Sequence, residues 1–346
     1  MNIFPLIALG ECTTDLGGDI LDVRYQQISF KDTEPYETTS YGPWGKHYNG
    51  LEGWYEESKN NNFELSLQTQ YEPEYALKKH EEQERTAGVT LKKTIIHKLE
   101  KDEPIRNVKD AYLKLYLLSE LWSLPNSLNL EGIFSALPNV AWTNHGPMHP
   151  DTLEEAREMS TDFIHVTSLD KFPCLTDYII PKGVRIADAS RVRLGAYLSE
   201  GTTVMHEGFI NFNAGTLGPA MIEGRISAGV VVGKNSDLGG GCSTMGTLSG
   251  GNDVKISVGE DCLLGANSGL GIPLGDRCTL EAGLYLTGGS KVEVLDQNNN
   301  LIETLKASEL SLKPDLLFIR NSLSGAIQCK PNKKSVVLND QLHSND

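Results

Sequence analysis

The chain has 346 residues, and 46 Asp and Glu outweigh 31 Lys and Arg to give a formal net charge of −15. This balance argues against nucleic acid or an anionic membrane surface as the main partner, because both are bound through clustered Lys and Arg. No stretch reaches the roughly 20 apolar residues that cross a bilayer, and no basic segment precedes the short apolar run near the start. We therefore expect a soluble cytoplasmic protein.

The cysteines form no CxxC pair and no regular framework, so neither a zinc ribbon nor a secreted disulfide scaffold is indicated. We expect buried, reduced thiols at all six positions, which are Cys12, Cys174, Cys242, Cys262, Cys278 and Cys329.

Residues 1–104 are polar and weakly patterned, and we expect them to form an N-terminal α/β domain. Residues 105–183 are expected to be a helical or linker region. Apolar residues at steps of three and four predict an amphipathic helix, on the face formed by Val108, Ala111, Leu115, Leu118 and Leu121. A second short helix is expected over 151–159 with Asp151 as its N-cap, and the Pro, Asn and Gly of residues 137–147 predict a loop between the two.

Residues 184–292 repeat with a period of six. A six-residue step cannot form one face of a helix, but it fits a short strand and a corner repeated around a narrow prism, so we expect a parallel β-helix of about six coils. The repeating positions are Ile186, Val192, Leu198, Val204, Ile210, Thr216, Ile222 and Ala228, then Val232, Leu238 and Thr244, then Val258, Leu264 and Leu270, and finally Leu274, Leu280, Leu286 and Val292.

Small residues beside these positions fit the corners, where positive φ or close backbone approach favours glycine. They are Ala187, Gly195, Gly233, Gly239, Gly265 and Gly275. The period ends at Val292, and residues 293–346 contain several short strand patterns. These predict a small C-terminal β cap over the open end of the solenoid.

A prism this narrow has no internal cavity, so a ligand must bind outside it, in grooves between packed copies. Polar side chains crowd residues 204–229, where His206, Glu207, Glu223 and Arg225 lie close in sequence. The glycine runs do not connect a strand to a helix, so they are weak phosphate-binding signals. A γ-class carbonic anhydrase would need three His ligands, and His206 is the one histidine in the repeats.

Several long strings closely resemble the tetrahydrodipicolinate N-succinyltransferase family in its longer form. They are VRIADASRVRLGAYLSEGTTVMHEGFINFNAGT, MIEGRISAGVVVG, GGGCSTMGTLSGG, LLGANSGLGIPLGDRC, EAGLYLTGGSKV and LLFIRNS, with LPNVAWTN and DKFPCLTDY before them. The resemblance covers roughly residues 105–346. It implies a left-handed β-helix, a homotrimer with active sites between subunits, and succinyl transfer from succinyl-CoA to the amino group of the hydrated, ring-opening tetrahydrodipicolinate, in the succinylase route to diaminopimelate and lysine.

The family's catalytic glutamate, in the MxEGR string, corresponds to Glu223. A carboxylate there could attack the thioester to form an acyl anhydride or could accept the proton of the incoming amine. We favour the second role slightly and keep both open, with His206 as a second candidate base.

The resemblance also implies a set of acyl-CoA contacts, in which Lys306 and Arg320 would meet the nucleotide phosphates. The full set is Arg225, Gly240, Ser243, Ala266, Glu281, Ala282, Gly289, Lys306, Arg320, Asn321 and Ser322. Some relatives bind Mg²⁺ on the trimer axis through an Asp and a Glu. The Glu corresponds to Glu207, but Ser190 stands at the Asp position, so one carboxylate of the expected metal site is missing.

Two other functions remain open from the residues. One is a CoA-dependent acyltransferase acting on another amino acid or on an amino sugar. The other is a solenoid that only binds or assembles, for which repetitive coil faces would be typical. The coil faces of this chain vary and keep Glu223 beside Arg225, which favours an enzyme.

Overall fold

A computed structural model describes residues 3–31, 89–246 and 254–332. By their contacts the residues form two compact units. We call Met1–Tyr116 with Asn129–Pro173 the N-terminal unit, and Leu117–Leu128 with Cys174–Asp346 the solenoid unit. The four-part division expected from the sequence remains a prediction.

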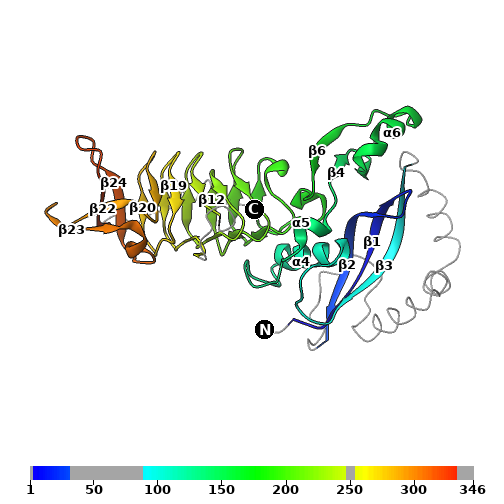
Figure 1. Cartoon of the computed structure of the whole chain (residues 1–346), viewed down its shortest axis with the longest axis horizontal. Helices are drawn as coiled ribbons and strands as arrows, with labels where there is room; N and C mark the ends of the chain where they lie inside the picture. Colours follow the sequence, from blue (N-terminus) through cyan, green and yellow to red (C-terminus); the bar gives the residue numbers. More distant parts are fainter. Residues whose placement is uncertain (1–2, 32–88, 247–253, 333–346) are drawn as a thin grey trace. The chain divides into compact units, whose positions relative to one another are not determined.

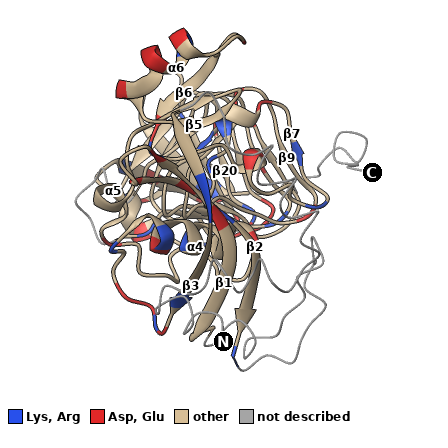
Figure 2. Cartoon of the chain, turned by 90° about the vertical axis from the view of Figure 1, so that its right-hand side faces the viewer, with Lys and Arg blue, Asp and Glu red and all other residues tan. Residues whose placement is uncertain are grey.

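The N-terminal unit contains an antiparallel sheet of strands β2 (Ile20–Phe30), β1 (Leu6–Asp15) and β3 (Thr90–Leu99), with β1 in the middle (Figures 1 and 2). A second sheet has the order β5 (Gly146–Met148), β4 (Val140–Thr143) and β6 (Val166–Asp170). The helices are α4 (Val108–Ser119), whose last three residues count with the solenoid unit, α5 (Ile133–Ala136) and α6 (Leu153–Met159). Figure 2 shows acidic residues on α6.

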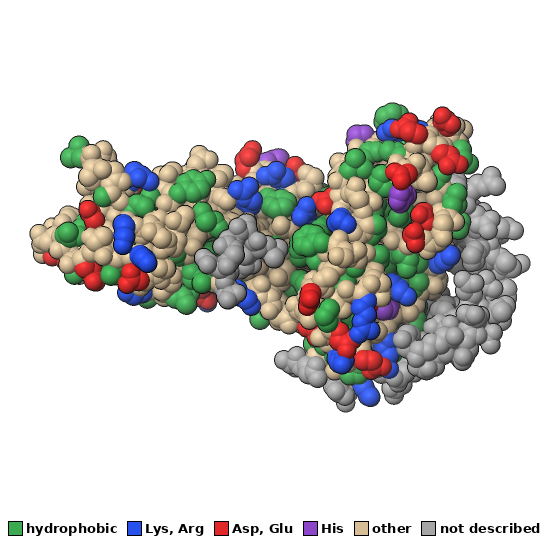
Figure 3. All heavy atoms as spheres, in the orientation of Figure 1, with side chains coloured by type: hydrophobic (Ala, Val, Ile, Leu, Met, Phe, Trp, Pro, Cys, Tyr) green, Lys and Arg blue, Asp and Glu red, His purple; other side chains and the backbone are tan. Residues whose placement is uncertain are grey.

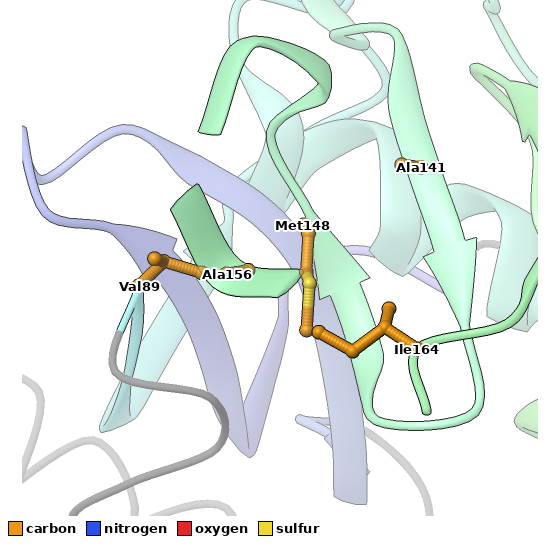
Figure 4. Close-up of a cluster of buried hydrophobic side chains, with 5 residues drawn as sticks. All are labelled: Val89, Ala141, Met148, Ala156 and Ile164. Carbon is orange, nitrogen blue, oxygen red and sulfur yellow. The ribbon is translucent and has the colours of Figure 1, made fainter. Parts of the chain in front are cut away.

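Five buried apolar side chains form a cluster in this unit, and Figure 4 shows Met148 of β5 pointing toward Ile164. The other members are Val89, Ala141 and Ala156. The cluster packs α6 against the β4–β5 hairpin, so burial of apolar surface holds these short elements together.

Three expectations for residues 105–159 are wrong. Helix α4 is not amphipathic, because Ala111–Ser119 are buried all round. Its Lys114 is 1% exposed and donates hydrogen bonds to Asp102 Oδ1 and to the carbonyls of Glu103 and Asn129. Residues 137–147 do not form a loop, since they contain β4 and begin β5, which pair around Asn144 and His145.

The N-cap of helix α6 lies one residue later than expected. Asp151 lies inside a 3₁₀ turn (Pro150–Thr152), and Thr152 occupies the N-cap position of α6. The side chain that caps the turn is His149, whose Nδ1 accepts a hydrogen bond from the Asp151 amide.

The coil strands of the solenoid unit pair in parallel and form three sheets, as the six-residue period predicts. This stacking of short parallel strands is consistent with a left-handed β-helix. Face 1 consists of β7 (Arg185–Ile186), β9 (Thr202–Val204), β12 (Ala220–Ile222), β15 (Ser236–Leu238), β18 (Leu263–Leu264), β20 (Thr279–Leu280) and β24 (Leu316–Arg320). Face 2 consists of β10 (Phe209–Ile210), β13 (Arg225–Ile226), β16 (Ser243–Thr244), β19 (Gly269–Gly271) and β21 (Tyr285–Thr287). Face 3 consists of β8 (Tyr197–Leu198), β11 (Gly215–Thr216), β14 (Val231–Val232) and β17 (Ser257–Val258).

The predicted inward positions are confirmed with one exception. On face 1, Val204, Ile222, Leu238, Leu264 and Leu280 pair in register and are buried. On face 2, however, Ile226 rather than Ala228 stacks on Ile210. The change of phase therefore falls earlier than the sequence suggested, directly after Ile222.

Two kinds of small residue form the corners. Gly195 has positive φ, whereas at Gly233, Gly239, Gly265 and Gly275 a Cβ would lie within 2.3–2.9 Å of the adjacent coil's backbone. The sequence reading missed a second set of left-handed corner residues, since Asn213, Asn235, Asp261, Asn267 and Arg277 all have φ of 54–58°.

The C-terminal cap is built on β24, which pairs in parallel with β20 and antiparallel with β25 (Ile327–Pro331). Strands β22 (Lys291–Leu295) and β23 (Leu301–Lys306) form a hairpin beside β25. The strands of this segment thus continue face 1 beyond the last coil, a pairing that the sequence did not predict.

None of the six cysteines forms a disulfide, and five are buried, with Cys174 half-buried. Cys262 and Cys278 are fully buried in the solenoid, as expected for interior residues. Burial raises the pKa of Cys12 to about 11 and that of Cys242 to about 12. Among the described residues, no helix has both the length and the apolar character needed to span a membrane.

Candidate active site

One corner of the solenoid, between faces 1 and 2, carries most of the predicted site residues. We call it the active-site corner. Backbone hydrogen bonds connect its coils, from the Gly241 amide to Glu223 O (3.3 Å) and from the Asn267 amide to Gly240 O (2.9 Å). Successive coils place there His206 and Glu207, Glu223, Gly240, Ala266, and Glu281 with Ala282.

The corner that contains Glu223 is two residues shorter than its neighbours. Only Glu223 and Gly224 lie between β12 and β13, whereas residues 205–208 and 239–242 fill the same corner in the adjacent coils. Gly224 allows this tight path, because a Cβ there would lie 2.3 Å from Cys242 Sγ. The short corner accounts for the phase change and keeps Glu223 next to Arg225.

The Glu223 side chain is half-buried and lies toward the next coil. A Cβ at position 240 would be 3.6 Å from Glu223 Oε2, so glycine there leaves open space in front of the carboxylate. The backbone is fixed by a hydrogen bond from the Glu223 amide to Leu238 O (2.8 Å). The Glu223 backbone is therefore held by a rung of the solenoid, and space for a methyl-sized group is open beside its carboxylate.

Arg225 and Ser243 point outward from face 2, directly beside this corner. They pair across β13 and β16, and Arg225 Nη2 donates to Ser243 Oγ at 2.8 Å. Tyr285 lies further along the same face, with its ring over Gly269, where a Cβ would be 2.2 Å from Tyr285 Cδ1. A cation and a hydroxyl thus lie on the face beside Glu223, and an aromatic ring lies three rungs from Arg225 along the same face.

The active-site corner ends at the β24–β25 turn. Glu281 Oε2 accepts a hydrogen bond from the Arg320 amide (2.6 Å), and Arg320 Nη1 donates to Gly325 O (2.9 Å). Asn321 Oδ1 accepts from the amides of residues 323 and 324, which orders the turn that exposes Ser322. The row of predicted site residues that begins at Glu223 therefore continues to Arg320, Asn321 and Ser322.

Gly289 and Lys306 do not lie in this corner. They lie together beyond the other end of β21, where Lys306 pairs with Lys291 and the Ala307 amide donates to Ser290 O. Both residues are exposed, and a Cβ at Gly289 would meet nothing within 4 Å. A ligand that touched every predicted residue would have to turn across face 2 near Tyr285.

The residues at the predicted metal position do not form a cation site within one chain. Ser190 Oγ donates to Asp188 Oδ1 (2.7 Å), and this bond, with that from the Ser190 amide, lowers the pKa of Asp188. Glu207 is exposed and supplies one carboxylate. The described parts of the chain contain no group of three or more His, Cys, Asp or Glu that could hold a metal.

The sequence reading missed a basic group just before Glu223. Arg191 and Arg193 both lie over the ring of Phe209, which pairs with Arg225 on face 2. Figure 3 shows basic, acidic and histidine side chains gathered over the first coils of the solenoid. Their positions in the sequence could have indicated this group. Arg191 and Arg193 flank the inward residue Val192, so both are expected to point outward.

Comparisons with known proteins agree with this architecture. A family model described as the hexapeptide repeat of succinyl-transferase matches residues 255–288, and the tetrahydrodipicolinate N-succinyltransferase middle model matches residues 137–173.

Relatives named 2,3,4,5-tetrahydropyridine-2,6-dicarboxylate N-succinyltransferase share 58% identity in Pseudomonas putida and 55% in Vibrio cholerae, each over 72% of this chain and 73% of theirs. A crystal structure from Campylobacter jejuni, described as a 2,3,4,5-tetrahydropyridine-2-carboxylate N-succinyltransferase, has a TM-score of 0.76 and 31% identity, over 97% of this chain and 94% of that one. On this identity and coverage, the chain belongs to the tetrahydrodipicolinate N-succinyltransferase family.

Proposed function

We propose that this chain transfers the succinyl group of succinyl-CoA to the amino group of tetrahydrodipicolinate. One water adds to the imine carbon of the acceptor and the ring opens, which exposes this amino group and leaves the 6-oxo group. The products are CoA and N-succinyl-2-amino-6-oxopimelate, in the succinylase branch of diaminopimelate and lysine biosynthesis. The names of the relatives support the reaction. The observation that carries the chemistry is the two-residue corner, which places the Glu223 carboxylate beside Gly240 and directly before the strand that carries Arg225.

In the mechanism that we favour, Glu223 is a general base. The amine nitrogen attacks the thioester carbonyl carbon, the C–S bond breaks, and its electron pair leaves with the CoA sulfur. Glu223 accepts the proton lost by the amine, and the CoA thiolate takes up a proton. Such base catalysis contributes on the order of 10² to 10⁴ in rate. His206, one coil earlier in the same corner, is the second candidate base.

The alternative keeps Glu223 but gives it a covalent role. Its carboxylate would attack the thioester carbonyl, release the CoA thiolate and form a mixed anhydride, which the amine would then open. The two routes differ in whether succinyl-CoA alone releases CoA.

We propose that the acyl-CoA arm runs along the active-site corner from Glu223 past Gly240, Ala266 and Glu281 toward Arg320. Rungs stack about 4.8 Å apart, so these four steps span roughly 19 Å. Arg320 would then hold the phosphates, since cations bind anions locally even on an acidic protein, and Lys306 would join it where the ligand turns across face 2 near Tyr285.

We further propose that the chain acts as a homotrimer with active sites between subunits, with small molecules as its substrates. A cytoplasmic location remains a prediction. No step of the mechanism uses Mg²⁺, because Glu207 and Ser190 of one chain do not make a coordination sphere.

A thiol-release assay tests the function. Purified protein is given succinyl-CoA or acetyl-CoA, each with and without tetrahydrodipicolinate. We expect release that needs both succinyl-CoA and tetrahydrodipicolinate. Release without preference for this acceptor would indicate an acyltransferase with another target, and no release in any mixture would favour the binding solenoid.

A further inference from the structure

The acceptor subsite can be placed by elimination, given the proposed function. The predicted CoA contacts that lie in the active-site corner are all on the C-terminal side of Glu223, from Gly240 to Arg320, and the others lie on face 2 from Arg225 onward or beyond β21. An amine that meets the thioester at Glu223 must therefore come from the N-terminal side, where the first rungs of face 2 carry Arg191, Arg193 and Phe209.

These three side chains form an ordered group. Val192 and Ile210 are bridged and buried, so Arg191 and Arg193 flank an inward residue and emerge on the outer surface. Their guanidinium carbons lie 5.9 and 5.8 Å from the centre of the Phe209 ring, within the range of cation–π attraction.

Hydrogen bonds to the next rung hold both arginines in place. Arg191 Nε donates to Gly208 O (3.2 Å) and Nη2 to Glu207 O (3.0 Å). Arg193 Nη1 donates to Asn211 Oδ1 (3.2 Å). A guanidinium has five N–H donors, so Arg191 keeps donors beyond these two contacts. The geometry is thus set before any ligand arrives.

We propose that Arg191 and Arg193, held against Phe209, bind the carboxylates of a dicarboxylate acceptor and present its amine to Glu223. A dianion needs local cations on a chain whose net charge is −15. Guanidinium groups bind carboxylates through charge-assisted, often bidentate, hydrogen bonds. Phe209 pairs directly with Arg225, so this subsite is one rung from the predicted end of the acyl chain.

The kinetic test uses Arg191→Met and Arg193→Met, which remove the charge but keep an unbranched side chain. We expect each to raise KM for tetrahydrodipicolinate roughly 10- to 100-fold, as loss of a charge-assisted hydrogen bond predicts. KM for succinyl-CoA should stay within about 2-fold. Arg193→Lys should restore part of the loss. Arg157→Met, which removes a cation paired with Glu154 on α6, is the control and should change neither constant.

A binding measurement tests the subsite without turnover. Calorimetry compares pimelate, a seven-carbon dicarboxylate, with heptanoate, its monocarboxylate counterpart. We expect the wild-type protein to prefer pimelate and Arg193→Met to lose that preference, with unchanged circular dichroism. Unchanged acceptor KM in both Met variants, or equal binding of the two acids by wild type, would overturn the proposal. Absence of thiol release by wild type would instead overturn the proposed function, while the calorimetric comparison would still decide the subsite.

Discussion

At the scale of single residues, the geometry of the site depends on two glycines. Gly224 lets the chain turn in two residues beside Cys242, and Gly240 leaves space before the Glu223 carboxylate. The sequence supplied Glu223 and Arg225 through a family resemblance. It did not reveal the shortened corner, because Ala228 fits the six-residue step as well as Ile226 fits the shorter one. Sequence reading therefore predicted which residues to examine, but not how they are held.

Replacing Glu223 with Gln tests the central residue. The change keeps volume and removes the carboxylate, so we expect a folded protein whose kcat falls about 10²- to 10⁴-fold. The measurement is thiol release with succinyl-CoA and tetrahydrodipicolinate. Glu260→Gln, which removes a surface carboxylate paired with Lys234, is the control. Full activity of Glu223→Gln would contradict the assignment.

The same assay separates the two roles of Glu223. With wild-type protein and succinyl-CoA alone, an anhydride would release about one CoA per site in a burst. The general-base role predicts no burst until the amine is added. Rapid mixing with a thiol reagent measures the difference.

At the scale of elements, the corners determine how the coils stack. Asn213 combines φ of 55° with side-chain bonds to the segment that follows α4. Its Oδ1 accepts from the Asn126 amide (2.7 Å), and its Nδ2 donates to Asn126 Oδ1 (3.2 Å). The six-residue repeat did not identify Asn213 as a corner residue, and a contact between residues 87 apart lies beyond any local pattern.

Substitutions at Asn213 separate its two contributions. Gly keeps the left-handed backbone and loses the side-chain bonds, whereas Ala loses both. We expect Ala to lower the free energy of unfolding by about 2–4 kcal/mol and Gly by about 1–2 kcal/mol. Urea unfolding of both variants measures the difference. Equal stability of wild type and Ala would show that this corner is not held by Asn213.

The cap is fastened to the last coil by a pair whose strength depends on pH. Arg277 donates to both carboxylate oxygens of Asp315 (2.6 and 2.9 Å), and these bonds lower the pKa of Asp315. A lowered pKa in the folded state means that the stabilisation is present above the unfolded pKa of about 3.9 and is lost as pH falls through the folded value.

Asp315→Asn tests this link, since Asn also tolerates the φ of 60° at this position. We expect the variant to be less stable than wild type at neutral pH, and the gap to shrink below about pH 4. Thermal unfolding from pH 7 to pH 2.5 measures it. A gap that is constant over this range would exclude the ion pair as its cause.

At the scale of the whole molecule, the part of the fold that could be predicted from the sequence was the part with a sequence repeat. The solenoid is fixed by a period that recurs in each coil, so the register of its inward residues was predicted except at Ala228. The N-terminal unit has no such redundancy. Its helix α4 is buried on every side, including the side that carries Lys114. Strand β4 pairs with β5 although their segment contains Pro, Asn and Gly. These outcomes depend on tertiary contacts, which override local propensity.

Two exposed apolar side chains of the solenoid unit are relevant to the assembly of the chain into oligomers. In the solenoid unit, Trp122 and Leu124 are 41% and 53% exposed although both are large and apolar. Neighbouring apolar side chains of this kind are typical of surfaces that associate. Because the proposed sites lie between subunits, we expect a mass of three 37.9 kDa chains by analytical ultracentrifugation, and activity per chain that falls when dilution separates them.

A charged substitution should break this assembly. Leu124→Glu would place a carboxylate in the contact, so we expect smaller species and a loss of most activity with unchanged circular dichroism. Leu16→Glu, at an equally exposed leucine (57%) of the β1–β2 turn, should leave both mass and activity unchanged. A Leu124→Glu protein that stayed trimeric would place the contact elsewhere on the chain. A fully active monomer would show that each chain completes its own site, and the active-site corner would then have to bind both substrates alone.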